Sequence, residues 1–231
     1  MNDSDRLPGE RRIRSYSLRQ GRITTAQREA LQTLWKDYCL APDQSFDATA
    51  VFSRGDAPLI LEIGFGNGDT LLELASAHPE NDYLGIEVHR PGVGHLLRLL
   101  AQHGVTNVRI YCADAVDVLE RCLPDSSLDG VNLFFPDPWP KKRHHKRRLV
   151  SPEFINLITK KLKLGGRFHA ATDWEDYAQS MLSVLDANSH LRNTAPSGSF
   201  IERPGQRPLT KFERRGLKLG HKVWDLDYRR I

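Results

Sequence analysis

From Pro58 onward, the chain alternates short apolar runs with longer amphipathic segments. The apolar runs predict strands at 59–63, 83–88, 108–112, 128–135 and 166–171. The amphipathic segments predict helices near 69–77, 91–103, 115–122, 151–162 and 174–187. Strand–helix alternation of this length favours a parallel sheet covered by helices on both faces. The pattern therefore predicts an α/β fold.

Both ends of the chain depart from this alternation. Residues 1–22 carry six arginines and few apolar groups, which predicts a flexible basic arm. Apolar residues at helical spacing predict a helix over 25–40. A stretch rich in Pro, Gly and Arg at 195–216 predicts an irregular loop, and imperfect alternation over 221–229 predicts a last, antiparallel strand.

We expect two parts of unequal size. Residues 1–50 would form the basic arm and a peripheral helix, and residues 51–231 a single domain that includes a substrate loop at 195–220. No apolar run approaches the roughly 20 residues of a membrane span, and the charged beginning predicts no signal peptide. Cys39, Cys112 and Cys122 lack the spacing of disulfides or metal sites. These features predict a cytoplasmic protein without a structural metal.

The net charge of +4 conceals an uneven distribution. Residues 56–130 hold twelve acidic side chains against four Lys or Arg, whereas 141–148 hold six Lys or Arg and no acid. Residues 202–231 hold nine basic and four acidic side chains. This division predicts an acidic half that binds a small molecule and a basic half that faces a polyanion.

A glycine-rich turn follows the first predicted strand. Gly64, Gly66 and Gly68 are spaced G-x-G-x-G, directly before a predicted helix, and Glu62 precedes them. Glycines allow close backbone approach to a ligand, and a helix N-terminus offers free N–H groups. The dinucleotide fingerprint would be G-x-G-x-x-G, so this turn is compatible with a ligand site but does not specify the ligand. We select Gly64 and Gly66 as cofactor-binding candidates.

Acidic residues stand at the ends of four consecutive predicted strands. They are Glu62, Glu87, Asp114 and Asp137. Ligands of open α/β sheets bind outside the carboxyl ends of the strands, so four carboxylates would face one crevice. Asp114 alone could equally cap the next helix. Such a crevice suits the cationic S-adenosylmethionine better than a nicotinamide dinucleotide, whose pyrophosphate the carboxylates would repel.

The segment 136–148 joins this acidic crevice to a basic block. Prolines flank Asp137 and Trp139, and the cations follow immediately. We expect the block to bind RNA phosphates through Arg143, His144, His145, Lys146, Arg147 and Arg148. Metal binding by the two histidines is the less favoured alternative, because it needs neutral imidazoles and further ligands. Trp139 could stack on a base or pack beneath the loop.

Several motifs now resemble one known family. E-I-G-F-G-N-G, G-I-E-V-H, C-A-D-A, F-P-D-P-W-P-K-K-R-H-H-K-R-R and P-L-T-K-F-E-R-R-G occur in that order from about residue 58 onward. They resemble motifs of the bacterial tRNA (guanine-N7)-methyltransferases. The resemblance implies a class I methyltransferase fold, a Rossmann-like sheet of seven strands with an antiparallel last strand. It also implies S-adenosylmethionine as methyl donor and N7 of guanine 46, in the tRNA variable loop, as acceptor.

The resemblance also implies roles for single residues. Glu62, Glu87, Asp114 and Asp137 would line the cofactor site. The substrate would contact Lys141, Asp173, Thr210, Lys211, Phe212 and Glu213. Because guanine N7 carries a free lone pair, the transfer needs positioning and a suitable field rather than a base. We choose Asp137 as the catalytic carboxylate that stabilises positive charge moving from sulfur to guanine.

Asp173, with Glu213 in a shared role, could accept the N1–H and N2–H groups of guanine. Two alternatives to tRNA methylation remain at this point: methylation of another RNA, and RNA binding by a protein with a vestigial cofactor fold. We expect a monomer or a weak homodimer.

Overall fold

The computed structural model describes residues 13–16, 21–205, 207–210, 213–214, 220 and 222–231. In this part of the chain, one sheet has the strand order β3-β2-β1-β4-β5-β7-β6. Its strands are β1 (Leu59–Ile63), β2 (Asp82–Ile86), β3 (Val108–Tyr111), β4 (Leu128–Phe134), β5 (Leu162–Thr172), β6 (Leu191–Asn193) and β7 (Trp224–Arg230). The first five run parallel, whereas β7 is antiparallel to both β5 and β6. The seven-stranded α/β sheet with a reversed last strand is therefore confirmed.

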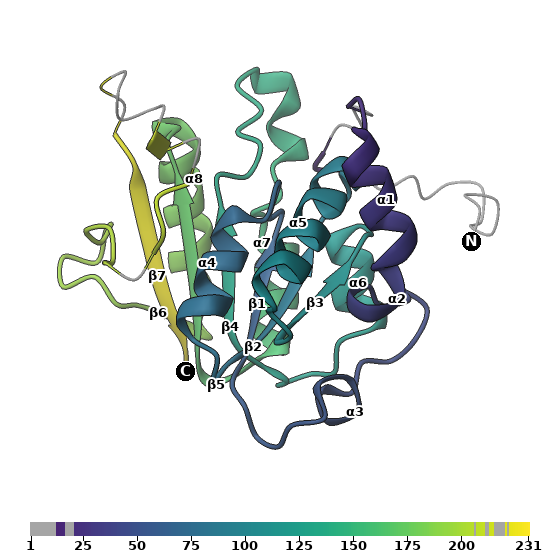
Figure 1. The fold of residues 1–231 in the computed structure, drawn as a ribbon. Coiled ribbons are helices and arrows are strands. Elements are labelled where there is room, and N and C mark those ends of the chain that lie inside the picture. Colours follow the sequence, from purple (N-terminus) through teal and green to yellow (C-terminus); the bar gives the residue numbers. More distant parts are fainter. Residues whose placement is uncertain (1–12, 17–20, 206, 211–212, 215–219, 221) are drawn as a thin grey trace, which may run out of the picture.

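Helices cover both faces of the sheet (Figure 1). One layer contains α1 (Thr25–Thr33), α4 (Asp69–Ala77) and α5 (Arg90–His103), and the other contains α6 (Ala115–Arg121), α7 (Pro152–Lys161) and α8 (Glu175–Asp186). The short helices are α2 (Trp35–Tyr38), α3 (Ala48–Phe52) and the 3-10 helix η1 (Lys142–Arg147). Buried apolar residues form one cluster on each side of the sheet. None of the described helices is long and apolar enough to cross a membrane.

Local caps explain where several helices begin. Thr24 and Gln27 form a reciprocal capping box at the start of α1, and Ser151 accepts a hydrogen bond from Phe154 N–H at the start of α7. The helix predicted over 25–40 is divided, because α1 ends at Thr33 and α2 begins at Trp35. Neither α3 nor the three-residue β6 was predicted, since each is too short to show a clear period.

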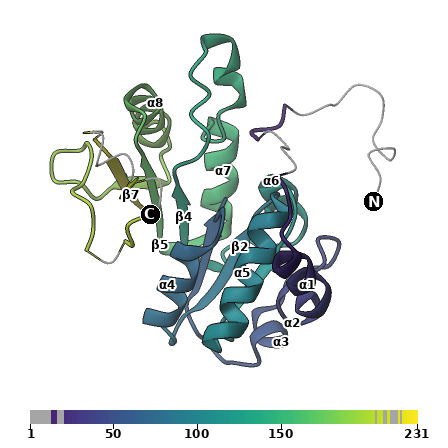
Figure 2. The same ribbon diagram turned by 45° about the horizontal axis from the view of Figure 1, so that its top comes forward.

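The parallel order brings the carboxyl ends of β1 to β5 to one edge of the sheet. The segment between β4 and α7 rises above this edge (Figure 1). The described part of the N-terminal arm, residues 13–16, contacts the same segment (Figure 2). The remaining residues of the predicted flexible arm up to 20 lie outside the described residues.

Candidate cofactor and acceptor site

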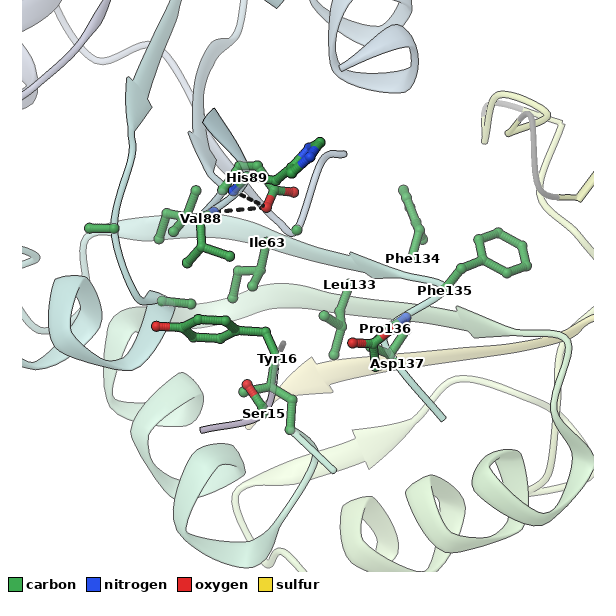
Figure 3. A pocket seen from close by; sticks show the side chains of 16 residues that line it. Ser15, Tyr16, Ile63, Val88, His89, Leu133, Phe134, Phe135, Pro136 and Asp137 are labelled. Carbon is green, nitrogen blue, oxygen red and sulfur yellow. Dashed lines mark hydrogen bonds between the residues drawn. The ribbon is translucent and has the colours of Figure 1, made fainter. Parts of the chain in front are cut away.

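A pocket of about 550 Å³ opens at the carboxyl edge of the sheet (Figure 3). Apolar side chains form most of its wall, among them Ile63, Ile86, Leu133 and Leu149. The predicted residues that line it are Gly64, Glu87 and Asp137. A mostly apolar cleft with a few convergent polar groups is typical of cofactor sites in α/β proteins.

The glycine turn and Glu87 form one hydrogen-bonded unit beside the pocket. Gly64 and Gly66 have φ angles of +73° and +60°, which other residues rarely adopt. Glu87 accepts the N–H of Gly66 at 2.8 Å with one oxygen, and the N–H groups of Val88 and His89 at 2.7 and 2.9 Å with the other. The carboxylate thus holds the glycine turn against the end of β2.

Glu62 lies inside the protein rather than on the pocket wall. It belongs to β1 and is 3% exposed, and its Oε2 atom has no hydrogen-bond partner among the described residues. Burial, and secondly the nearby charge of Glu87, raise the pKa of Glu62 to about 8. A buried carboxyl group with an unsatisfied oxygen requires a physical explanation, because such groups normally find a partner.

Asp114 has two roles in this structure. It caps α6 by accepting the N–H of Val116 at 2.9 Å, as the simpler alternative predicted. It also receives a hydrogen bond from the phenol of Tyr16. Burial, followed by the charge of Asp114, raises the pKa of Tyr16. Asp114 therefore lies beside the pocket, where Ala113 and Ala115 form part of the wall.

Asp137 is exposed in a turn that leaves the end of β4. Two residues of this turn, Phe135 and Trp139, have positive φ angles of 52° and 45°. Non-glycine residues with such angles cost free energy and tend to occur at functional sites. The turn thereby places Asp137 on the wall of the pocket instead of in a continuing strand.

Sequence patterns did not identify Ser15 and Tyr16, which lie on the pocket wall (Figure 3). The indole N–H of Trp139 donates to the carbonyl of Ser15 at 2.9 Å. Arg147 donates to the carbonyls of Arg14 and Tyr16, each at 3.2 Å. Because these are contacts to backbone carbonyls from a segment more than 120 residues away, no local motif could have indicated them.

The basic block is partly exposed and partly engaged within the protein. Lys141, Lys142, Arg143 and Lys146 are exposed. The guanidinium of Arg147 lies 3.9 Å from the centre of the Trp139 ring. The indole therefore packs within the loop, which is the second of the two alternatives considered for Trp139.

Arg148 differs from the rest of the block because it is 8% exposed. It donates to the carbonyl of Pro138 at 2.9 Å and pairs with Asp176 on α8. His145 lies 3.8 Å from the same carboxylate. These contacts join the loop to α8. Because Arg148 is both buried and engaged in them, its side chain is not available on the surface.

The predicted acceptor residues come from segments that follow Asp137 in the sequence. Asp173, half-buried, follows β5, and Thr210 accepts the N–H of Glu213 at 3.0 Å. Glu213 is 2% exposed and forms two hydrogen bonds with Arg207. Lys211 and Phe212 lie outside the described residues. Within the described part of the chain, no cluster of His, Cys, Asp and Glu could hold a metal ion.

Known proteins resemble the chain over most of its length. A family model described as "Putative methyltransferase" matches residues 56–226. A tRNA (guanine-N(7)-)-methyltransferase of Methylococcus capsulatus is 57% identical over 220 residues, which cover 95% of each chain. A protein of the same name from Alcanivorax borkumensis is 53% identical over 228 residues, covering 97% of this chain and 95% of the relative.

Solved structures with low sequence identity share the fold. The 16S rRNA methyltransferase KamB has a TM-score of 0.59 at 17% identity, covering 81% of this chain and 96% of its own. The aminoglycoside resistance methyltransferase NpmB1 has a TM-score of 0.51 at 18% identity, covering 95% and 98%. These likenesses show a Rossmann-like methyltransferase fold. Together with the close relatives of full length, they show that the chain belongs to the tRNA (guanine-N7)-methyltransferase family.

Proposed function

We propose that this protein transfers the methyl group of S-adenosylmethionine to N7 of guanine 46 in tRNA, in the cytoplasm. The main support is the pocket at the carboxyl edge of the sheet, which Asp137 lines. The partly exposed basic block at 141–148 begins only four residues after Asp137. This order supports a small-molecule site beside a surface that suits RNA phosphates.

The residues present fit S-adenosylmethionine. A pocket of about 550 Å³ is within the size range of cofactor sites. Gly64 and Gly66 leave open space where side chains would otherwise project. Glu87 lines the pocket and Asp114 lies beside it, so two carboxylates are close to the space where the cofactor would bind. When bound, this cofactor supplies a methyl group already activated by a sulfonium leaving group.

Asp137 is the residue that we assign to catalysis. It lines the pocket and is exposed, so an acceptor could approach it. Guanine N7 needs no deprotonation, so the carboxylate would act through its negative charge on the ring that becomes cationic. The strained turn from Phe135 to Trp139 fixes where this charge lies.

The acceptor guanine would be held beside Asp137 by residues from two other segments. Asp173 can accept the N1–H and N2–H groups of guanine, which adenine does not present in the same arrangement. Lys141 and the segment Thr210-Lys211-Phe212-Glu213 would complete this side of the site. Arg143, His144, His145, Lys146 and Arg147 would bind phosphates, whereas we assign the buried Arg148 to holding the loop.

Transfer of labelled methyl groups tests the proposal. Unmodified tRNA is incubated with the protein and labelled S-adenosylmethionine, and the digested nucleosides are separated. We expect label in 7-methylguanosine, and none when guanine 46 is replaced by adenine. Label in another nucleoside, or the absence of 7-methylguanosine, would overturn the assignment.

A further inference from the structure

A buried cluster of charged residues lies on the sheet outside the cofactor pocket. His169 of β5, Asp225 of β7, Arg207 and Glu213 are each between 1% and 3% exposed. The backbone of Ile201 also bonds to that of Asp225 at 3.0 Å, so the segment after β6 lies along β7. The cluster therefore attaches the late loop to two strands of the sheet.

Arg207 is the centre of this cluster. Its guanidinium donates to the two carboxylate oxygens of Glu213 at 2.6 and 2.7 Å. It also donates to Asp225 Oδ2 at 3.0 Å, and its Nε lies 2.8 Å from Asp225 Oδ1. His169 contacts the same Asp225 at 2.8 Å. A planar guanidinium that meets two carboxylates in this way fixes both their direction and their distance.

Stability alone is a poor explanation for such a cluster. Removing charges from water costs several kcal/mol per ion, and apolar residues of the same volume often stabilise a protein as well or better. A bidentate ion pair does, however, define the geometry between the segments that it joins.

Arg207 also contacts the end of β4 and the first residue of the turn that carries Asp137. Its guanidinium carbon lies 5.7 Å from the centre of the Phe134 ring and 5.8 Å from that of Phe135. Phe135 also lines the cofactor pocket, has a φ of 52° and donates its N–H to Ala171 of β5 at 2.8 Å. One side chain thus touches both the segment that ends in Glu213 and the strained turn two residues before Asp137.

We propose that Arg207 is a positioning residue of the methyl transfer, which holds Glu213 and the turn Phe135–Asp137 in a fixed relation. The inference rests on the proposed function. Glu213 then acts by orienting its segment through Arg207 and makes no direct contact with guanine, since its two oxygens are paired and only 2% of the residue is exposed. The acceptor is aligned with the donor because the two sides of the site share this contact.

The substitution Arg207→Lys tests this role, because lysine keeps the charge but loses the bidentate fork. Arg167→Lys is the matched control: Arg167 on β5 pairs with Asp227 of β7 and has no contact with Phe135 or Glu213 in the described structure. For each variant, kcat and KM for tRNA are measured with saturating cofactor, and the affinity for S-adenosylhomocysteine is measured by calorimetry. Glu213→Gln, which keeps the shape of the side chain, is the second variant.

We expect kcat of Arg207→Lys and Glu213→Gln to fall at least about tenfold, since a misplacement near 1 Å can cost about a hundredfold. Arg167→Lys should stay within about twofold of the wild type, and all variants should bind S-adenosylhomocysteine with wild-type affinity, because Arg207 is outside the pocket. Equal kcat in Arg207→Lys and Arg167→Lys would overturn the positioning role, as would a parallel loss of cofactor affinity. A wild-type protein that forms no 7-methylguanosine would instead refute the proposed function.

Discussion

The indole N–H of Trp139 donates to the carbonyl of Ser15 at 2.9 Å, across 124 positions of sequence. This bond and the two from Arg147 hold the segment Arg14–Tyr16 against the wall of the cofactor pocket. Arg147 of the basic block therefore holds the N-terminal segment. Substitutions in the block should consequently differ in their effects on cofactor and tRNA binding.

Tyr16 is expected to contribute to cofactor affinity because its ring forms part of the pocket wall. Tyr16→Ala should weaken the binding of S-adenosylhomocysteine about tenfold, which corresponds to about 1.4 kcal/mol. Tyr16→Phe keeps the ring and loses only the hydrogen bond to Asp114, so its loss should be smaller. Calorimetric titration measures these affinities. Wild-type affinity in Tyr16→Ala would show that the segment does not contribute to the site.

Substitutions of Lys146 and Arg147 should distinguish two roles of the basic block, phosphate binding and support of the pocket wall. Lys146 is exposed, so Lys146→Ala should weaken tRNA binding and reduce the salt slope by about 0.7–0.9, with unchanged cofactor affinity. Arg147→Ala should in addition weaken S-adenosylhomocysteine binding, because the carbonyls of Arg14 and Tyr16 lose their donor. Salt titrations of tRNA binding and calorimetry give the two readings. Equal cofactor affinity in both variants would contradict the supporting role.

Glu62 should make the unfolding free energy depend on pH. Burial, and then Glu87, raise its pKa from 4.5 to about 8. Between these values the folded protein holds a proton that the unfolded chain has released, so the contribution of Glu62 to stability falls as pH rises. From pH 5.5 to 7.5, the wild type should lose about 2 kcal/mol relative to Glu62→Gln. Urea unfolding at both pH values measures this, and parallel curves for the two proteins would argue against a raised pKa.

Asp137→Asn tests whether the carboxylate acts through its charge. The amide keeps the size of the side chain, so cofactor affinity should change little, while kcat should fall about a hundredfold through loss of electrostatic stabilisation. Asp129→Asn is the control, because Asp129 lies at the beginning of β4, where it accepts the N–H of Leu59. Single-turnover methyl transfer measures the chemical step. Near-normal turnover of Asp137→Asn would show that only the geometry of the side chain matters.

Much of the fold was predictable because its signals are local. The apolar runs gave the first five strands within a few residues, apart from the beginning of β5, and the reversed last strand was also anticipated. The family motifs likewise lie within short stretches, from the turn at Gly64 to the segment at Asp137. The three residues of β6 were missed, since pairing with β7 defines them rather than any period of their own.

The candidate site was only partly predictable. The strand-end rule placed Glu87, Asp114 and Asp137 at or beside the pocket. It could not indicate that Glu62 is buried below the wall, because its position within β1 directs the side chain into the protein. Nor could a charge count distinguish the buried Arg148 from the exposed Lys146.

Periodicity and short motifs thus determined the α/β class, the order of the main elements and the edge of the sheet where chemistry was expected. These depend on residues only a few positions apart. Only the tertiary structure decided that Tyr16 borders the pocket, that Arg147 holds its segment, and that Arg207 links Glu213 to Phe135. Such contacts depend on backbone carbonyls and buried ion pairs between distant segments, and local patterns of side chains carry no information about them.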